Sequence, residues 1–123
     1  MDGNGAEAGA THAPPTLGAR EIAHRLGAYP PRLRGYPTGD KALRPAAVLV
    51  PLLKGPSDIS VLLTVRASHL REHAGQVSFP GGRLEPGDAS PEANAIREAF
   101  EEIGLAADLI EPIGRLDTYC TGS

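Results

Sequence analysis

Apolar and polar positions change their period along the chain, and the clearest helical period lies between residues 91 and 103. The apolar residues that recur there at the spacing of one helix face are Ile96, Ala99, Phe100 and Ile103. Ser90 suits the N-cap of such a helix, Pro91 its first turn, and Gly104 its C-cap. We therefore expect an amphipathic helix that buries those four apolar side chains.

Two apolar runs upstream of this helix predict β structure. Residues 46–53 read AAVLVPLL and residues 59–66 read ISVLLTVR, with Gly-Pro-Ser-Asp between them. This pattern predicts a hairpin of buried strands, in which Pro51 indicates an edge or a bulge. The remaining short elements that we expect are a helix at 17–26 and strands at 76–79 and 113–119.

The other segments favour irregular structure. Residues 1–16 are rich in glycine, alanine and proline and have no apolar period, which predicts a disordered tail. Residues 29–44 and 69–75 are expected to be loops, the second of them basic. A chain of 123 residues is enough for one small domain, which we place at residues 17–123.

Composition excludes several classes of protein. The net charge of −3 does not favour a nucleic-acid or membrane surface, and no apolar run is long enough to span a bilayer. A single cysteine, Cys120, excludes an internal disulfide framework and fits a reducing compartment. We therefore expect a cytoplasmic protein; the sequence does not indicate an oligomeric state.

Candidate chemistry lies on the polar side of the 91–103 helix. Its charged residues are Arg97, Glu98, Glu101 and Glu102. Spacings of three and four residues allow the glutamates to converge beyond one edge of the helix, where repulsion raises their pKa values unless a cation lies among them. Carboxylate oxygens favour Mg²⁺ or Mn²⁺. The alternative is a solvated glutamate-rich face; the Gly-rich turn just before the helix favours a site.

These residues carry a resemblance to a known family. Gly82 to Leu105 resembles the Nudix box, G-x5-E-x7-R-E-U-x-E-E-x-G-U, where U is apolar; Asp88 replaces the first glutamate, with eight residues between it and Arg97. Leu62 to Gly82 is similar to the block of coenzyme A pyrophosphatases in that superfamily, L-L-T-x-R-[SA]-x3-R-x3-G-x3-F-P-G-G. Every fixed position of that block is present.

The resemblance implies an α/β fold, an α/β/α sandwich with a mixed sheet that continues beyond Ser123, so that residues 17–123 would be the N-terminal portion of the domain. It implies a small-molecule substrate and cleavage of the diphosphate of coenzyme A to 3′,5′-ADP and 4′-phosphopantetheine, with Mg²⁺ or Mn²⁺ as cofactor. Two alternatives stay open: hydrolysis of another nucleoside diphosphate derivative, and a non-catalytic fragment. Because the sandwich would be incomplete, we expect residues 1–123 alone to be poorly folded and inactive.

The resemblance also assigns roles to individual residues. The implied metal ligands are Glu98, Glu101, Glu102, the Gly82 carbonyl and, through a bound water, Asp88. For Asp88, a role as a turn residue is an equal alternative. The implied catalytic residues are Glu101, Glu102 and Arg97, and Arg97 is expected to pair with a glutamate. Arg66 and Arg71 are the expected contacts to substrate phosphates, whereas His69 and His73 receive no role.

Overall fold

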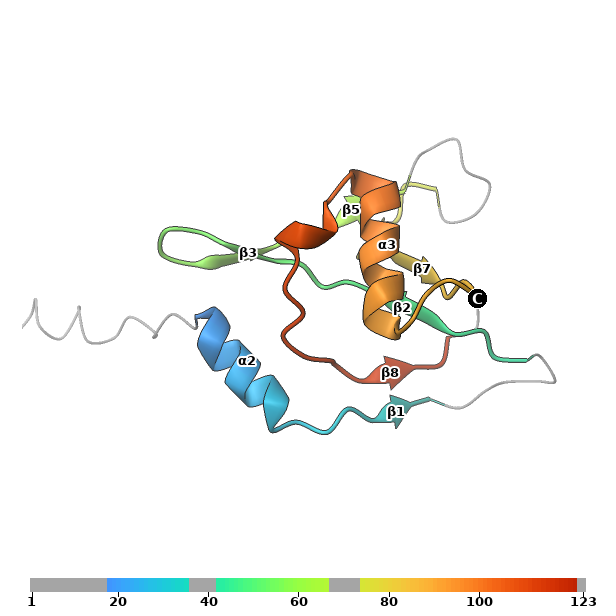
Figure 1. The fold of residues 1–123 in the computed structure, drawn as a ribbon, viewed down its shortest axis with the longest axis horizontal. Helices are drawn as coiled ribbons and strands as arrows, with labels where there is room; N and C mark the ends of the chain where they lie inside the picture. Colours follow the sequence, from blue (N-terminus) through green and yellow to red (C-terminus); the bar gives the residue numbers. More distant parts are fainter. Residues whose placement is uncertain (1–17, 36–41, 67–73, 122–123) are drawn as a thin grey trace, which may run out of the picture.

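The computed structural model describes residues 18–35, 42–66 and 74–121, which form a mixed α/β fold (Figure 1). The helices are α2 (Ala19–Gly27), α3 (Pro91–Ile103) and the 3₁₀ turn η1 (Ala107–Leu109). The strands are β1 (Leu33–Arg34), β2 (Ala46–Val48), β3 (Leu52–Lys54), β4 (Ile59–Val61), β5 (Thr64–Val65), β6 (Val77–Ser78), β7 (Gly81–Arg83) and β8 (Thr118–Tyr119). Within these ranges, every helix is too short or too polar to cross a membrane. The expected tail at 1–16 and most of the basic loop at 69–75 lie outside the described residues.

The strands associate in pairs, one of them parallel and the others antiparallel. The pairs are β1–β8 (parallel), β2–β7, β3–β4 and β5–β6 (antiparallel). The hairpin between the two apolar runs is confirmed for β3 and β4. Each run is split, however, because Pro51 has no N–H to donate to the ladder, although its carbonyl still accepts a hydrogen bond from Leu62 N at 3.1 Å. Beyond this break, β2 leaves the hairpin and pairs with β7.

The prediction that these strands are buried is wrong, because none of their large apolar side chains is fully buried. Val48, Leu53, Val61, Leu63 and Val65 are all exposed. Each strand pairs with a single neighbour in the described residues, and α3 is the helix that packs on strands there, against β2 and β7. The opposite faces therefore stay open.

Helix α3 has the predicted ends. Ser90 Oγ accepts a hydrogen bond from Ala93 N at 3.1 Å, which satisfies one free N–H of the first turn. Gly104 takes φ 69°, the left-handed conformation that ends many helices, and its N–H closes on the last turn. These two caps set the ends of α3 and therefore the positions of the charged residues along it.

The predicted buried face of α3 is partly wrong. Ala99 is buried and Ile96 half-buried, but Phe100 is 60% and Ile103 39% exposed. The fully buried residues are Asn94, Ala95 and Ala99. They face β2 and β7, where Ala47 pairs with Gly82. A helix can approach glycine strands closely only through small side chains, so the alanines rather than the bulky residues lie at the centre of the contact.

The C-terminal part of the described chain returns to β1, as the two adjacent arrows in Figure 1 show. The predicted strand at 113–119 is limited to β8, and its partner β1 lies in a segment that we expected to be a loop. Asp117 fastens this pair: its carboxylate accepts hydrogen bonds from Tyr29 Oη, Arg32 N and Arg34 Nε at 2.8–3.0 Å. These donors, the Arg32 N–H first, lower the pKa of Asp117.

Candidate functional site

The candidate site lies where β7 passes under α3. Gly82 faces Glu98 so closely that a Cβ on Gly82 would lie 2.6 Å from the Glu98 carboxyl carbon. The Glu98 side chain is only 16% exposed. The glycine pair at 81–82, which we expected to form a turn, is a strand, and its lack of side chains lets the Glu98 carboxylate lie against the backbone.

Arg97 gathers the acidic groups around the start of this contact. Its guanidinium donates to both oxygens of Asp88 at 2.9 and 3.0 Å, and to Glu98 Oε1 and Glu101 Oε2 at 3.1 Å. Glu85 Oε1 lies 3.5 Å from the same guanidinium. Hydrogen bonding to Asp88 raises the pKa of Arg97, which stays charged. The expected pairing of Arg97 with a glutamate is confirmed, and Glu98 is held in a fixed orientation by it.

The surroundings of Asp88 differ from those expected of a carboxylate that binds a metal-bound water. Its side chain is only 5% exposed, and besides the two bonds from Arg97 it accepts one from Glu85 N at 2.8 Å. The guanidinium of Arg97 and this backbone N–H lower the pKa of Asp88. The turn at 85–88 is thereby tied to α3, although one residue more than in the box pattern separates Asp88 from Arg97. This geometry favours a positioning role for Asp88; its role toward a metal stays a prediction.

The three helix glutamates do not converge on one point. Glu101 is drawn to Arg97, whereas Glu102, one turn after Glu98, lies near Gly81. Burial is the main reason that the pKa of Glu102 is raised; repulsion from Glu98 and Glu101 adds to it, and the Gly81 backbone and Arg66 oppose it. No group of three acidic, histidine or cysteine side chains in residues 18–35, 42–66 and 74–121 is arranged to hold a metal ion.

The donors nevertheless fit a magnesium-type cation. Glu98 and Glu102 follow each other by one helical turn along the Gly81–Gly82 backbone. Mg²⁺ is typically held by one or two carboxylates together with water and substrate phosphates, so a complete protein cage is not required. A partly buried carboxylate with a raised pKa is also one whose charge a cation would stabilise. Two carboxylates that lie against this strand therefore suffice for a metal that shares its coordination with water and a substrate.

A groove of about 720 Å³ opens beside Glu102. Its lining residues are Leu62, Leu63, Thr64, Val65, Arg66, Ser78, Gly81, Glu102, Ile103, Gly104 and Leu105. Apolar side chains thus lie next to one acidic and one basic group at the end of α3. Of the two arginines expected to contact phosphates, Arg66 lies in this groove, and Arg71 lies outside the described residues.

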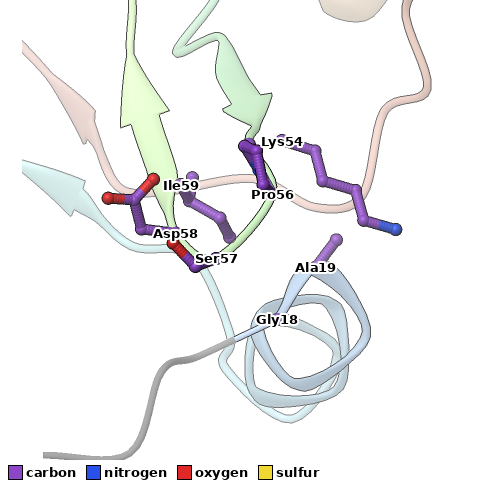
Figure 2. Close-up of a pocket in the computed structure, with 8 residues that line it drawn as sticks. Gly18, Ala19, Lys54, Pro56, Ser57, Asp58 and Ile59 are labelled. Atoms are coloured by element: carbon purple, nitrogen blue, oxygen red, sulfur yellow. The ribbon is translucent and has the colours of Figure 1, made fainter.

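A second, smaller hollow of about 170 Å³ lies elsewhere, between the start of α2 and the tip of the β3–β4 hairpin (Figure 2). It is lined by Lys54, Ser57, Asp58 and neighbouring residues of the hairpin. None of the expected site residues that the structure describes lines it. We therefore place the candidate site at the β7–α3 contact and the 720 Å³ groove.

Sequence reasoning missed two parts of the site. The Arg83 carbonyl accepts hydrogen bonds from Arg97 Nη2 at 3.1 Å and from Asn94 Nδ2 at 3.2 Å, and Asn94 is fully buried. Position 94 falls among the unspecified residues of the box pattern, so the resemblance gave no signal for it. A polar residue between Ala93 and Ala95 on the inner side of an amphipathic helix is the one feature that could have drawn attention to it.

Comparison with known proteins identifies the family of this chain. A family model described as NUDIX domain matches residues 43–122. Proteins named uncharacterized Nudix hydrolase NudL from Yersinia pestis (strain Pestoides F) and Yersinia pseudotuberculosis (serotype O:1b) are each 49% identical over 73 residues. That stretch is 59% of this chain and 36% of each relative, so the match spans about a third of their length. The match to the family model covers most of the chain and includes α3, its caps and the glycine strand, and the chain belongs to the Nudix family.

Proposed function

We propose that this protein hydrolyses the diphosphate of coenzyme A or its derivatives with the help of Mg²⁺ or Mn²⁺. The observation that carries the proposal is the close approach of Gly82 to Glu98, with Glu102 one turn further along α3. Diphosphate cleavage by water requires bound cations, because a polyanion otherwise repels the attack of water on phosphorus. These carboxylates could hold such a cation. The cytoplasm is the proposed location, since it is where coenzyme A and a reduced Cys120 are both expected.

Each residue of the site has a role in this proposal. Glu98, Glu102 and the Gly82 carbonyl would hold the cation, and Glu101 is the third carboxylate proposed as a ligand. When bound, the cation would polarise phosphoryl oxygens and neutralise the charge that develops on them. Arg97 orients Glu98 through the 3.1 Å bond and is itself oriented by Asp88. Glu101 and Glu102 are the proposed acceptors for the proton of the attacking water.

Support for coenzyme A as the substrate comes from the residues before the glycine strand. All fixed positions of the coenzyme A pyrophosphatase block are present between Leu62 and Gly82. Thr64, Arg66 and Ser78 from this block, or next to its fixed positions, line the 720 Å³ groove at Glu102. A groove with apolar walls and an arginine suits a ligand that has a phosphate at one end and an uncharged arm at the other.

The function is tested by separating the reaction products chromatographically. Coenzyme A is incubated with Mg²⁺ or Mn²⁺ and either this chain or a version extended with the downstream residues of the Yersinia pestis relative. The expected products are 3′,5′-ADP and 4′-phosphopantetheine in equal amounts, with none in the presence of a chelator. Cleavage of other nucleoside diphosphate derivatives but not of coenzyme A would favour a different Nudix substrate. A lack of any cleavage by either version would favour a non-catalytic protein.

The proposed role of Arg66 leads to a test of substrate choice. Coenzyme A carries a 3′-phosphate that dephospho-coenzyme A lacks, and Arg66 and Arg71 are the proposed contacts to phosphate. We expect Arg66→Ala to lower kcat/KM for coenzyme A by roughly tenfold or more, the loss of one charge-assisted hydrogen bond. Arg32→Ala, an arginine outside the groove, is the control. Each variant is assayed on coenzyme A and on dephospho-coenzyme A. If Arg66→Ala and Arg71→Ala both leave kcat/KM unchanged on these two substrates, the arginines are structural.

A further inference from the structure

The least expected buried group in α3 is the amide of Asn94. It is fully buried, and its Nδ2 donates to the Arg83 carbonyl at 3.2 Å. Its Oδ1 is also buried and accepts no hydrogen bond from any residue that the structure describes. An unpaired buried acceptor is unfavourable, and the next residues on this face, Ala95 and Ala99, pack there without polar atoms. Packing alone therefore gives no reason for an amide at this position.

The position of the amide suggests what it does. Arg83 follows Gly82 directly in β7, and Asn94 precedes Glu98 by one turn on the same face of α3. The bond between Asn94 and the Arg83 carbonyl therefore joins the strand to the helix one residue and one turn away from the place where Gly82 meets Glu98. Such a link fixes the register and the separation of these two groups.

Arg97 also donates to the Arg83 carbonyl, at 3.1 Å, but it is a less constant link. Its guanidinium is shared with Asp88, Glu98 and Glu101, and a cation bound to Glu98 or Glu101 would compete with it for their oxygens. The Asn94 amide is neutral and bonds to a backbone carbonyl. Its hydrogen bond to β7 is therefore the same whether or not a cation is bound to the carboxylates.

We propose that Asn94 is a positioning residue of the metal site. It holds the Arg83 carbonyl so that the Gly82 carbonyl and the Glu98 carboxylate stay in register for a divalent cation. This inference rests on the proposed metal-dependent function and adds to it a residue that the box pattern leaves unspecified. Partners that orient metal ligands typically contribute ten- to a hundredfold in metal affinity or activity.

The test measures Mn²⁺ binding directly, from the loss of the free-ion electron paramagnetic resonance signal on titration of the full chain. The variants are Asn94→Ala and Asn94→Ser, whose side chains are too short to reach the Arg83 carbonyl. Ala95→Gly is the matched control, because it weakens the same buried face of the helix without touching the carbonyl. Partial unfolding lowers apparent affinity in proportion to the folded fraction, and circular dichroism of each sample corrects for that fraction.

We expect the dissociation constant for Mn²⁺ to rise about tenfold or more in both Asn94 variants and to change less than about twofold in Ala95→Gly. Equal shifts in Asn94→Ala and Ala95→Gly, or no shift in either Asn94 variant, would overturn the inference. Glu98→Gln separates this result from the parent proposal. If Glu98→Gln binds Mn²⁺ like the wild type, or the wild type binds none, the metal site itself is wrong and the role of Asn94 falls with it.

Discussion

At the scale of single residues, one guanidinium determines how the acidic side chains are divided. Arg97 donates hydrogen bonds to Asp88, Glu98 and Glu101, whereas Glu102 is the helix glutamate that lines the groove. The sequence pattern treats the three glutamates alike, because spacing on a helix does not say which carboxylate an arginine will bind. The turn at 85–88, closed by the bond from Asp88 N to the Glu85 carbonyl, places Asp88 beside Arg97 and so helps to fix where this guanidinium lies.

Glu102 is therefore the residue whose charge we expect to matter most for turnover. Glu102→Gln keeps the shape of the side chain and removes its charge, and it should reduce kcat by at least about a hundredfold, as expected for loss of a preorganised electrostatic element. Glu111→Gln, at an exposed position outside α3, is the control and should leave kcat unchanged. The measurement is coenzyme A cleavage at saturating Mg²⁺ by the version extended with the downstream residues of the Yersinia pestis relative. Wild-type turnover in Glu102→Gln would remove this residue from the site.

At the scale of elements, the two glycines of β7 have different neighbours and predict different losses. A side chain at Gly81 would meet β2 at Ala47 and Val48, whereas one at Gly82 would meet the carboxyl end of the Glu98 side chain. Gly81→Ala should therefore break the β2–β7 pairing and lower the melting temperature. Gly82→Ala should displace the Glu98 carboxylate, weakening Mn²⁺ binding about tenfold or more with little change in melting temperature.

Gly87→Ala is the control for both substitutions, because no described residue other than its two chain neighbours lies within 4 Å of the added methyl group. It should leave both Mn²⁺ binding and melting unchanged. The expected order of melting temperatures is Gly87→Ala and Gly82→Ala near the wild type, with Gly81→Ala below them. Wild-type Mn²⁺ affinity in Gly82→Ala would show that the contact with Glu98 does not position a ligand.

The elements that the sequence predicted well are those specified by nearby residues. The start and end of α3 follow from Ser90, Pro91 and Gly104, and the β3–β4 hairpin from its turn. The misplaced features depend on distant partners. β1 exists because β8, more than eighty residues later, pairs with it through Asp117, and Gly81 and Gly82 form a strand because β2 lies beside them. The buried face of α3 was misjudged for the same reason, since the glycine strand selects Ala95 and Ala99 over Phe100.

At the scale of the whole molecule, Asp117 joins the N-terminal and C-terminal parts of the described chain. Its lowered pKa predicts that acid reduces the stability of the fold. Its pKa is lowered in the folded state, so the unfolded chain binds more protons below the ordinary value near 3.8. The stability from this group is complete above pH 3.8 and is lost as pH falls through the lowered pKa. Asp117→Asn should lower the melting temperature at pH 7 and flatten its decline below pH 4.

Glu21→Gln is the control, because it removes only an exposed ion pair with Arg25 that is worth under about 1 kcal/mol. Equal changes of the melting temperature at pH 7 in the two variants would contradict a special role for Asp117.

The exposed apolar surface predicts low stability for residues 1–123. Fifteen large apolar or aromatic side chains are exposed in the described ranges, whereas the buried apolar residues there are Ala95 and Ala99. Burial of a large side chain contributes about 1.5–3 kcal/mol, and ordering each residue costs about 1–2 kcal/mol of backbone entropy. With few such side chains buried, this balance favours a broad, weakly cooperative melt and binding of the dye 1-anilinonaphthalene-8-sulfonate to the exposed strand faces.

The comparison that tests this prediction is between the 123-residue chain and the version extended with the downstream residues of the Yersinia pestis relative. The extension should sharpen and raise the melt, reduce dye binding, and increase turnover in proportion to the gain in folded fraction. Mn²⁺ should raise the melting temperature of both versions if it binds only the folded state. A sharp two-state melt of the 123-residue chain without dye binding would contradict the prediction. It would mean that the caps of α3, the β2–β7 contact and the Asp117 bonds stabilise the fold without further burial of these side chains.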